Sequence, residues 1–180
     1  MTWLQTYTGK ALDLLDPRAD QIDPVDIAIS LARTCRYHGM TLRHYSVAEH
    51  SCLLHDWAVA EGLGSHAPLK ALLHDAHEAY VGDLPSPVKR ALSPAALDGW
   101  LDLTNAIDRA IAARFGLSTL HHPDVKRADT RILLDERDAL MGPPPRDWGI
   151  DDHPLGITIH GWDVERARCE FRYRLARWTR

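Results

Sequence analysis

The sequence predicts an all-α protein of about six helices. Apolar residues recur at helical spacing along most of the 180 residues, and strand-like alternation is brief. Hydrophobic residues make up 45% of the chain and charged residues 26%, proportions that are typical of a soluble globular protein. This length suits one domain with its own hydrophobic core, so we expect residues 1–180 to form a single compact domain.

Start and stop signals mark the first three predicted helices. An N-cap aspartate followed by proline starts a helix over residues 23–35. The second helix, over residues 46–62, starts with the capping-box pattern Ser46–Glu49 and ends at a glycine. The third covers residues 68–81 and also ends before a glycine. Two prolines in residues 83–87 lead us to expect no helix there.

The remaining helices are recognised mainly by their apolar faces. A Ser-Pro pair starts a helix over residues 93–116, which has one continuous apolar face. The next covers residues 124–141 and ends at a Gly-Pro-Pro-Pro run, and the last covers residues 164–178. Between these two, residues 142–162 form a loop with minor extended structure, as does a short piece near the N-terminus. Such a long loop in a compact domain usually has a purpose.

Composition also bounds the compartment and the partners. Three cysteines without a CxxC motif predict reduced thiols, and the first residues lack the pattern of a signal peptide, so we expect a cytoplasmic protein. No apolar run approaches the ~18 residues that a membrane span needs. A net charge of −4 argues against a protein that coats nucleic acid. We expect a homo-oligomer, a dimer or higher. Arginines crowd the C-terminus as on a solvated or subunit-facing surface: Arg166, Arg168, Arg172, Arg174, Arg177 and Arg180.

A His-Asp pair in an apolar segment is the first chemical signal. His74 and Asp75 are adjacent, and Glu78 lies one helical turn later on the same side. An imidazole and carboxylates are costly to bury without partners, so they must bind each other or a ligand. By itself this pattern fits a buried His–Asp hydrogen bond or an exposed polar stripe equally well.

Two further polar residues lie in apolar surroundings. His50 lies one turn into its helix and faces inward, and His44, before the helix, is the alternative. Asp129 interrupts an apolar stripe and therefore needs a cation, either a metal or an arginine, for which Arg36 is the unplaced candidate. Other polar residues fit solvent-exposed positions: His55, His66, Asp124, Asp135 and Asp138.

Two histidines and two aspartates from three helices make a mixed nitrogen and oxygen ligand set. The predicted ligands are His50, His74, Asp75 and Asp129. This set suits one divalent transition metal, Co, Mn or Zn, with Fe, Ni and Mg as further possibilities. Because no cysteine takes part, a closed structural zinc site is disfavoured, and positions remain open for water and substrate.

Four blocks of sequence resemble the HD-domain metal-dependent phosphohydrolases. They are similar to the bacterial 5′-deoxynucleotidase branch, which also contains phage dATP triphosphohydrolases. The blocks are Ser46–Ser51, Leu73–Ala79, Gly82–Lys89 and Lys126–Asp129. The order of the predicted ligands matches the H…HD…D signature of the family. The resemblance covers about residues 23–140 and implies an HD-domain helical bundle in which these four ligands hold the metal.

The resemblance also implies roles for the residues around the metal. Glu78 would orient or deprotonate the attacking water. Arg36 would bind phosphate and stabilise charge in the transition state, Tyr37 would pack on sugar or base, and Asp83 would touch the sugar 3′-hydroxyl. From its charge alone, Lys89 could attract the phosphate, although a solvated helix start explains it equally well.

The sequence therefore predicts an enzyme that hydrolyses deoxynucleoside 5′-phosphates with a metal. A 5′-deoxynucleotidase, which releases phosphate from a dNMP, is favoured over a dATP-type triphosphohydrolase, which releases tripolyphosphate from a dNTP. A non-catalytic nucleotide sensor would be expected to lack a ligand or Glu78, and neither is missing. A structural zinc protein would need cysteines or four closed positions.

Overall fold

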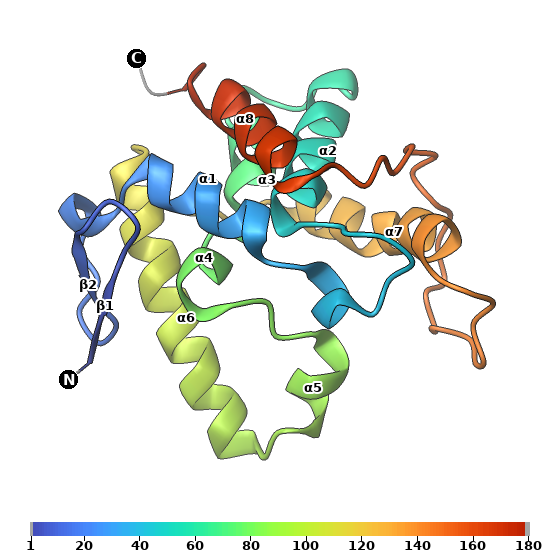
Figure 1. The fold of residues 1–180 in the computed structure, drawn as a ribbon, viewed down its shortest axis with the longest axis horizontal. Coiled ribbons are helices and arrows are strands. Elements are labelled where there is room, and N and C mark those ends of the chain that lie inside the picture. The colour runs from blue at the N-terminus through green and yellow to red at the C-terminus, as the bar shows by residue number, and fades with distance from the viewer. Residues whose placement is uncertain (1, 179–180) are drawn as a thin grey trace.

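The computed structural model describes residues 2–178 and confirms the all-α fold class (Figure 1). The helices are α1 Pro24–Arg33, α2 Val47–Ala60, α3 Ala67–Leu73, α4 Glu78–Val81, α5 Ser86–Ala91, α6 Pro94–Arg114, α7 Pro123–Leu140 and α8 Val164–Leu175. Strands β1 Trp3–Gln5 and β2 Ala11–Asp13 form one small antiparallel pair. No helix in the part of the chain that the structure describes is long and apolar enough to cross a membrane.

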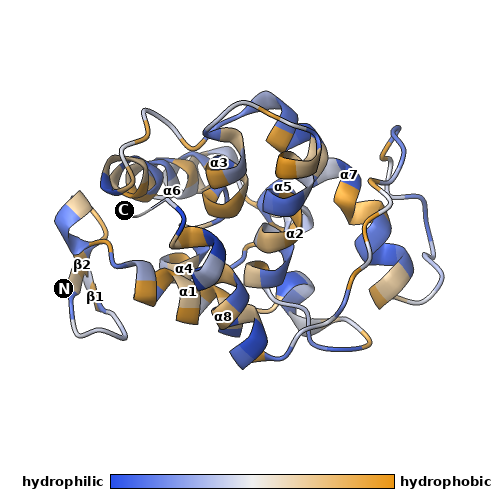
Figure 2. Cartoon of the chain, turned by 90° about the horizontal axis from the view of Figure 1, so that it is seen from above, coloured by the Kyte–Doolittle hydropathy of each residue, from blue (hydrophilic) through white to orange (hydrophobic). Residues whose placement is uncertain are grey.

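Helix α2 is the centre of the packing. It contacts α1, α3, α7 and α8, and it contributes to two hydrophobic clusters. Val47 and Cys52 join the cluster shared with α1, α3, α6 and α8, whereas Leu54 and Ala58 join the one shared with α7. Figure 2 shows both hydrophobic and hydrophilic residues on the same helices, as expected when one side of each faces the core. Residues 47–55 of α2 are therefore buried on every face, polar residues included, whereas the last turn of the helix is partly exposed.

The cap of α2 forms only in part. The Ser46 side chain accepts the Glu49 backbone N–H at 3.1 Å, as predicted. The Glu49 carboxylate does not return the bond, as a capping box requires. It is fully buried and accepts three consecutive backbone N–H groups, from His160, Gly161 and Trp162, at 2.6–2.9 Å. The capping-box prediction was therefore wrong for Glu49, whose partners lie more than a hundred residues away.

Helix α7 holds the same loop in a similar way. Asp135 accepts the backbone N–H groups of residues 155, 156 and 157 at 2.8–2.9 Å. Asp135 is half-buried rather than solvated, so its predicted exposure was wrong. No hydrogen-bonded strand forms in the loop 142–162. Instead, two carboxylates replace the backbone partners that a strand would have had, and they fix the loop against α2 and α7.

The third predicted helix, over residues 68–81, is divided into α3 and α4. The His74 side chain donates through Nδ1 to the Ala71 carbonyl at 2.8 Å, and a continuing α-helix would need that carbonyl for the Asp75 N–H. The chain then turns through residue pairs three apart, such as Ala76 N–H to the Leu73 carbonyl at 2.9 Å. This tighter turn allows the adjacent side chains of His74 and Asp75 to reach the same site.

The prediction of no helix near residues 83–87 was also wrong in part. Helix α5 starts at Ser86 and contains Pro87 within its first turn. The first N–H groups of a helix have no partner within the helix, so proline costs little there.

A strained turn, η2 (Arg36–Gly39), follows α1. Tyr37 and His38 both have positive φ values, 56° and 52°, which side-chain-bearing residues rarely adopt. The turn is held by the Arg36 N–H, which donates to the Tyr45 carbonyl at 3.0 Å. This conformation directs the Arg36 and Tyr37 side chains towards α7.

Candidate metal centre

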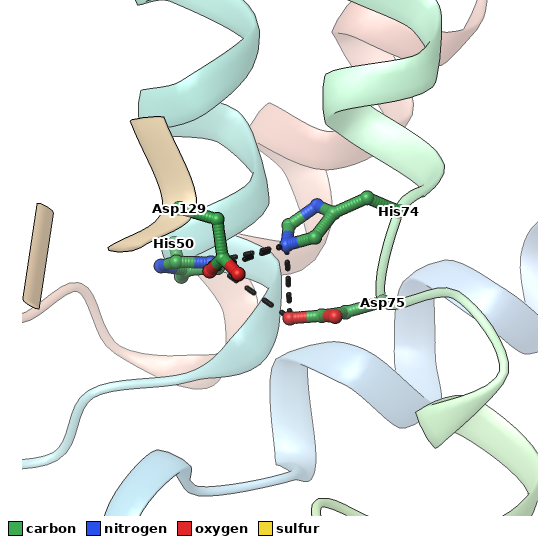
Figure 3. Close-up of side chains that lie close together, drawn as sticks. All are labelled: His50, His74, Asp75 and Asp129. Atoms are coloured by element: carbon green, nitrogen blue, oxygen red, sulfur yellow. Dashed lines mark hydrogen bonds and ion pairs between the residues drawn. The ribbon is translucent and has the colours of Figure 1, made fainter. Parts of the chain in front are cut away.

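The four predicted ligands lie together. Helix α2 supplies His50, the turn after α3 supplies His74 and Asp75, and α7 supplies Asp129 (Figure 3). One ligand atom from each lies within 4.8 Å of all the others, as a shared metal ion would require. The predicted convergence of three helical segments is therefore present in the fold.

The closest approaches involve the imidazole Nε2 atoms. The Nε2 atoms of His50 and His74 are 3.3 Å apart. His50 Nε2 lies 3.3 Å from Asp129 Oδ1, and His74 Nε2 lies 3.0 Å from Asp75 Oδ2. His50 is fully buried, and the other three side chains are 13–18% exposed. One side of the cluster therefore remains accessible.

Hydrogen bonds at the Nδ1 atoms of His50 and His74 leave both Nε2 atoms available to bind a cation. His74 Nδ1 faces the Ala71 carbonyl, and His50 Nδ1 faces the Glu136 carboxylate at 2.6 Å. Both partners accept hydrogen bonds, so both Nδ1 atoms carry the hydrogen. In the neutral rings, both Nε2 lone pairs then point to the place where two carboxylates converge. Four acceptors at one point repel one another unless a cation binds between them.

The charges within the cluster shift the pKa values of its own side chains. Burial lowers the pKa of His74, but the Asp75 and Asp129 carboxylates outweigh it and raise that pKa well above its usual value. Burial likewise opposes ionisation of both aspartates, yet the neighbouring imidazoles lower the pKa of each carboxyl. Protons and a divalent metal would therefore compete for this site.

The cation beside Asp129 is Lys126 rather than Arg36. Lys126 Nζ lies 2.9 Å from Asp129 Oδ2, one helical turn away. Arg36 lies between two other carboxylates, 3.4 Å from Asp75 and 3.4 Å from Glu136, and its Nε is buried without a partner. Of the two cations that the sequence allowed for Asp129, a metal or an arginine, the arginine is not found there, because Arg36 reaches the ligand Asp75 instead.

Glu136 was missed by sequence reasoning. It is fully buried and accepts hydrogen bonds from Tyr45 at 2.8 Å, from Tyr37, and from His50. Burial would raise its pKa, but Arg36, His50 and Tyr37 lower it to about 2, so this carboxylate is an anion at neutral pH. The available signal was its spacing, two helical turns after Asp129 on the same face of α7.

Glu78 has the opposite surroundings. It is 5% exposed, and its Oε2 has no hydrogen-bond partner among the described residues. Burial, followed by the negative charges of Asp75 and Asp83, raises its pKa well above the usual value. Burial also raises the pKa of the half-buried Asp83, although Arg36 and Lys89 oppose this. Glu78 and Asp83 thus lie close enough to the ligand Asp75 to be affected by its charge, and Lys89 lies close enough to Asp83 to act on it.

Tyr37 faces protein groups. Its hydroxyl donates to Glu136, and its ring lies 5.6 Å from the Arg36 guanidinium and 6.1 Å from the Trp148 ring. Trp148 also lines a groove of about 490 Å³ beside residues 39–42, and none of the four ligands lines this groove. The tyrosine therefore has a structural partner on α7, and its predicted stacking on a sugar or base stays a prediction.

The remaining histidines lie apart from the cluster. His44 Nδ1 contacts the Cys35 thiol at 3.4 Å, so His50 and not His44 belongs to the cluster. His66 is exposed before α3, as predicted. His55 is only 2% exposed, contrary to its predicted exposure, because α2 is covered by neighbouring helices and Asp56 accepts its Nδ1 hydrogen at 2.8 Å.

Several C-terminal arginines form ion pairs. Arg174 binds Asp56 through two nitrogens, at 2.6 and 2.9 Å, and it also binds Glu170. Arg168 pairs with Glu165. The predicted solvated surface is found at Arg166 and Arg172, which are exposed, but not at Arg174, whose side chain is only 12% exposed because it lies between α8 and Asp56 of α2. Arg180 lies outside the described residues.

Comparison with known proteins shows the family of the chain. No protein-family model matches it. The uncharacterized protein RCAP_rcc00048 of Rhodobacter capsulatus is 41% identical over 130 residues, which are 70% of this chain and 64% of that protein. The uncharacterized protein YfdR of Escherichia coli K12 is 34% identical over 161 residues, 89% of this chain and 80% of YfdR. At this identity and coverage, the chain belongs to the same family as YfdR.

Proposed function

We propose that this protein is a metal-dependent phosphohydrolase that removes phosphate from deoxynucleoside 5′-monophosphates. The observation that carries the proposal is the four-ligand cluster with the buried, unpartnered carboxylate of Glu78 beside it. A purely structural cluster has no need of a buried acid without partners, which is costly to keep. The choice of a deoxynucleotide rests on the resemblance of the four sequence blocks to the 5′-deoxynucleotidase branch of the HD-domain family.

The residues around the cluster supply the groups that phosphate ester hydrolysis needs. A divalent metal held there would polarise a phosphoryl oxygen and lower the pKa of bound water. Glu78 would accept the proton of the attacking water, a role suited to a raised pKa. Arg36, next to Asp75, would bind phosphate oxygens and stabilise the charge that develops on them. Asp83 would accept a hydrogen bond from the sugar 3′-hydroxyl, and Lys89 would attract the phosphate.

The test is a panel of dNMPs and dNTPs with Mn, Co, Zn or Mg, in which phosphate and tripolyphosphate are measured separately. We expect phosphate from dNMPs. Asp75→Ala should lower turnover by about 100-fold or more because it removes a metal ligand. Asp138→Ala, an exposed carboxylate on α7, is the matched control and should keep full activity.

Two results would contradict this proposal in different ways. Tripolyphosphate release from dNTPs without dNMP hydrolysis would assign the triphosphohydrolase reaction instead. Full turnover by folded Asp75→Ala, or by protein treated thoroughly with a chelator, would exclude the metal mechanism. Circular dichroism of each variant separates loss of chemistry from loss of fold.

A further inference from the structure

Glu136 is a buried carboxylate next to the cluster but not part of it. Its Oε1 accepts hydrogen bonds from His50 Nδ1 at 2.6 Å and from the Tyr45 hydroxyl at 2.8 Å. Its Oε2 accepts from the Tyr37 hydroxyl and lies 3.4 Å from Arg36 Nη2. Each oxygen thus has two donors, and neither has a lone pair directed at the ligand atoms.

The four partners come from a short part of the chain before and within α2. Arg36 and Tyr37 lie in the strained turn η2, and Tyr45 is fully buried just before the helix. Together they satisfy a buried carboxylate that would otherwise be costly. Two of the four contacts lead to predicted metal ligands. His50 is itself a ligand and is bound directly through Nδ1. Arg36 only lies between Glu136 and the ligand Asp75, 3.4 Å from each.

We propose that Glu136 is a positioning residue that fixes His50 with its hydrogen on Nδ1, so that the Nε2 lone pair faces the metal. This inference rests on the metal centre of the proposed function. A carboxylate behind a ligating histidine sets the tautomer and ring orientation and makes the ligand more basic.

The substitution Glu136→Gln tests this because an amide cannot serve both sides of the network. Arg36 can only donate, so the amide oxygen is required on the side of Oε2. The amide NH₂ group then faces His50, where it donates to Nδ1. The ring hydrogen must move to Nε2, where it blocks the atom that should bind the metal.

The experiment compares the full chain with Glu136→Gln and with Asp138→Asn, which alters an exposed carboxylate on the same helix. Cobalt(II) and zinc are titrated into metal-free protein, and ¹⁵N NMR reports the tautomer of His50. We expect Glu136→Gln to bind metal about 10- to 100-fold more weakly and to carry the hydrogen on Nε2. Asp138→Asn should match the wild type in both measurements.

Equal metal affinity in Glu136→Gln and the wild type would overturn the inference. If Glu136→Gln does not fold, the wild-type spectrum decides alone, because a metal-free His50 with its hydrogen on Nε2 contradicts the proposal. A wild type that binds metal but hydrolyses no nucleotide refutes the proposed function and leaves the role of Glu136 in place. A wild type that binds no divalent metal refutes both.

Discussion

Two buried glutamates border the same cluster, and they differ in their partners. Glu136 is surrounded by donors and a guanidinium, which outweigh burial and lower its pKa to about 2. Glu78 lies near Asp75 and Asp83, and burial together with their charges raises its pKa well above the usual value. Burial is nearly the same for both, so neighbouring charge and hydrogen bonding decide the sign of each shift.

These different surroundings suit the two carboxylates to different roles. A carboxylate saturated with donors remains an anion and holds its partners in place. A buried carboxylate without partners has a raised pKa and therefore accepts a proton more readily than an ordinary carboxylate. We therefore expect loss of a satisfied carboxylate to change structure, stability or metal affinity, and loss of the unpartnered one to change turnover.

The largest effect is expected for Glu78→Gln. If Glu78 accepts the proton of the attacking water, kcat should fall by about 100- to 10,000-fold. Metal affinity should stay within a few fold, and stability should not fall, because the substitution breaks no hydrogen bond of the buried Oε2 atom. The measurements are steady-state kinetics, cobalt titration and urea unfolding. If Glu78→Gln loses metal together with activity, Glu78 supports metal binding as Glu136 is proposed to do, and the contrast between the two glutamates is wrong.

The two carboxylates that bind the loop 142–162, Glu49 and Asp135, allow a similar comparison of stability. Glu49 and Asp135 each accept three backbone N–H groups, but Glu49 is fully buried and Asp135 is not. Glu49→Gln should lower the free energy of unfolding by about 1–3 kcal/mol, since a single amide oxygen leaves a buried N–H unpaired. Water can replace Asp135, so Asp135→Asn should cost less than about 1 kcal/mol.

Urea unfolding of metal-free protein at neutral pH measures both variants under the same conditions. Equal losses of stability would mean that burial of the acceptor does not decide the cost. The loop would then be held mainly by its other contacts, such as the Arg127 and Arg131 pairs with Asp152.

What the sequence could predict depended on local signals. The ligands His50 and Asp129 lie on helices, and His74 and Asp75 directly follow one, whose apolar spacing shows which residues face inward, so their convergence could be expected. Glu136 could not be assigned, because its donors lie 86–100 residues away. A helix pattern shows that a carboxylate faces the core but not which groups meet it there.

The errors have the same physical origin. Glu49 has the local sequence of a capping box, but a distant loop offers it three donors in place of one. At the break after α3, the His74 side chain donates to a backbone carbonyl, a contact that no propensity scale contains. In both cases a side-chain hydrogen bond to the backbone is found where the local sequence predicts a different bond.

The smallest effect is expected at a satisfied carboxylate that is exposed. Asp56 accepts hydrogen bonds from His55 and from two nitrogens of Arg174, but its side chain is 49% exposed. Burial acts to raise its pKa, yet His55 and Arg174 lower it to about 2. The folded state therefore holds the proton less tightly than the unfolded state, in which the pKa is near 3.9.

The sign of the pH dependence follows from this shift. The contribution of Asp56 to stability is complete above about pH 4 and is lost as the pH falls towards 2. Asp56→Asn should therefore be less stable than the wild type at pH 5 by under about 1 kcal/mol, because exposed ion pairs are screened by solvent. The difference should shrink as the pH approaches 2. A difference that is the same at pH 5 and pH 2, measured by urea unfolding, would mean that Asp56 acts through packing between α2 and α8 and not through its charge.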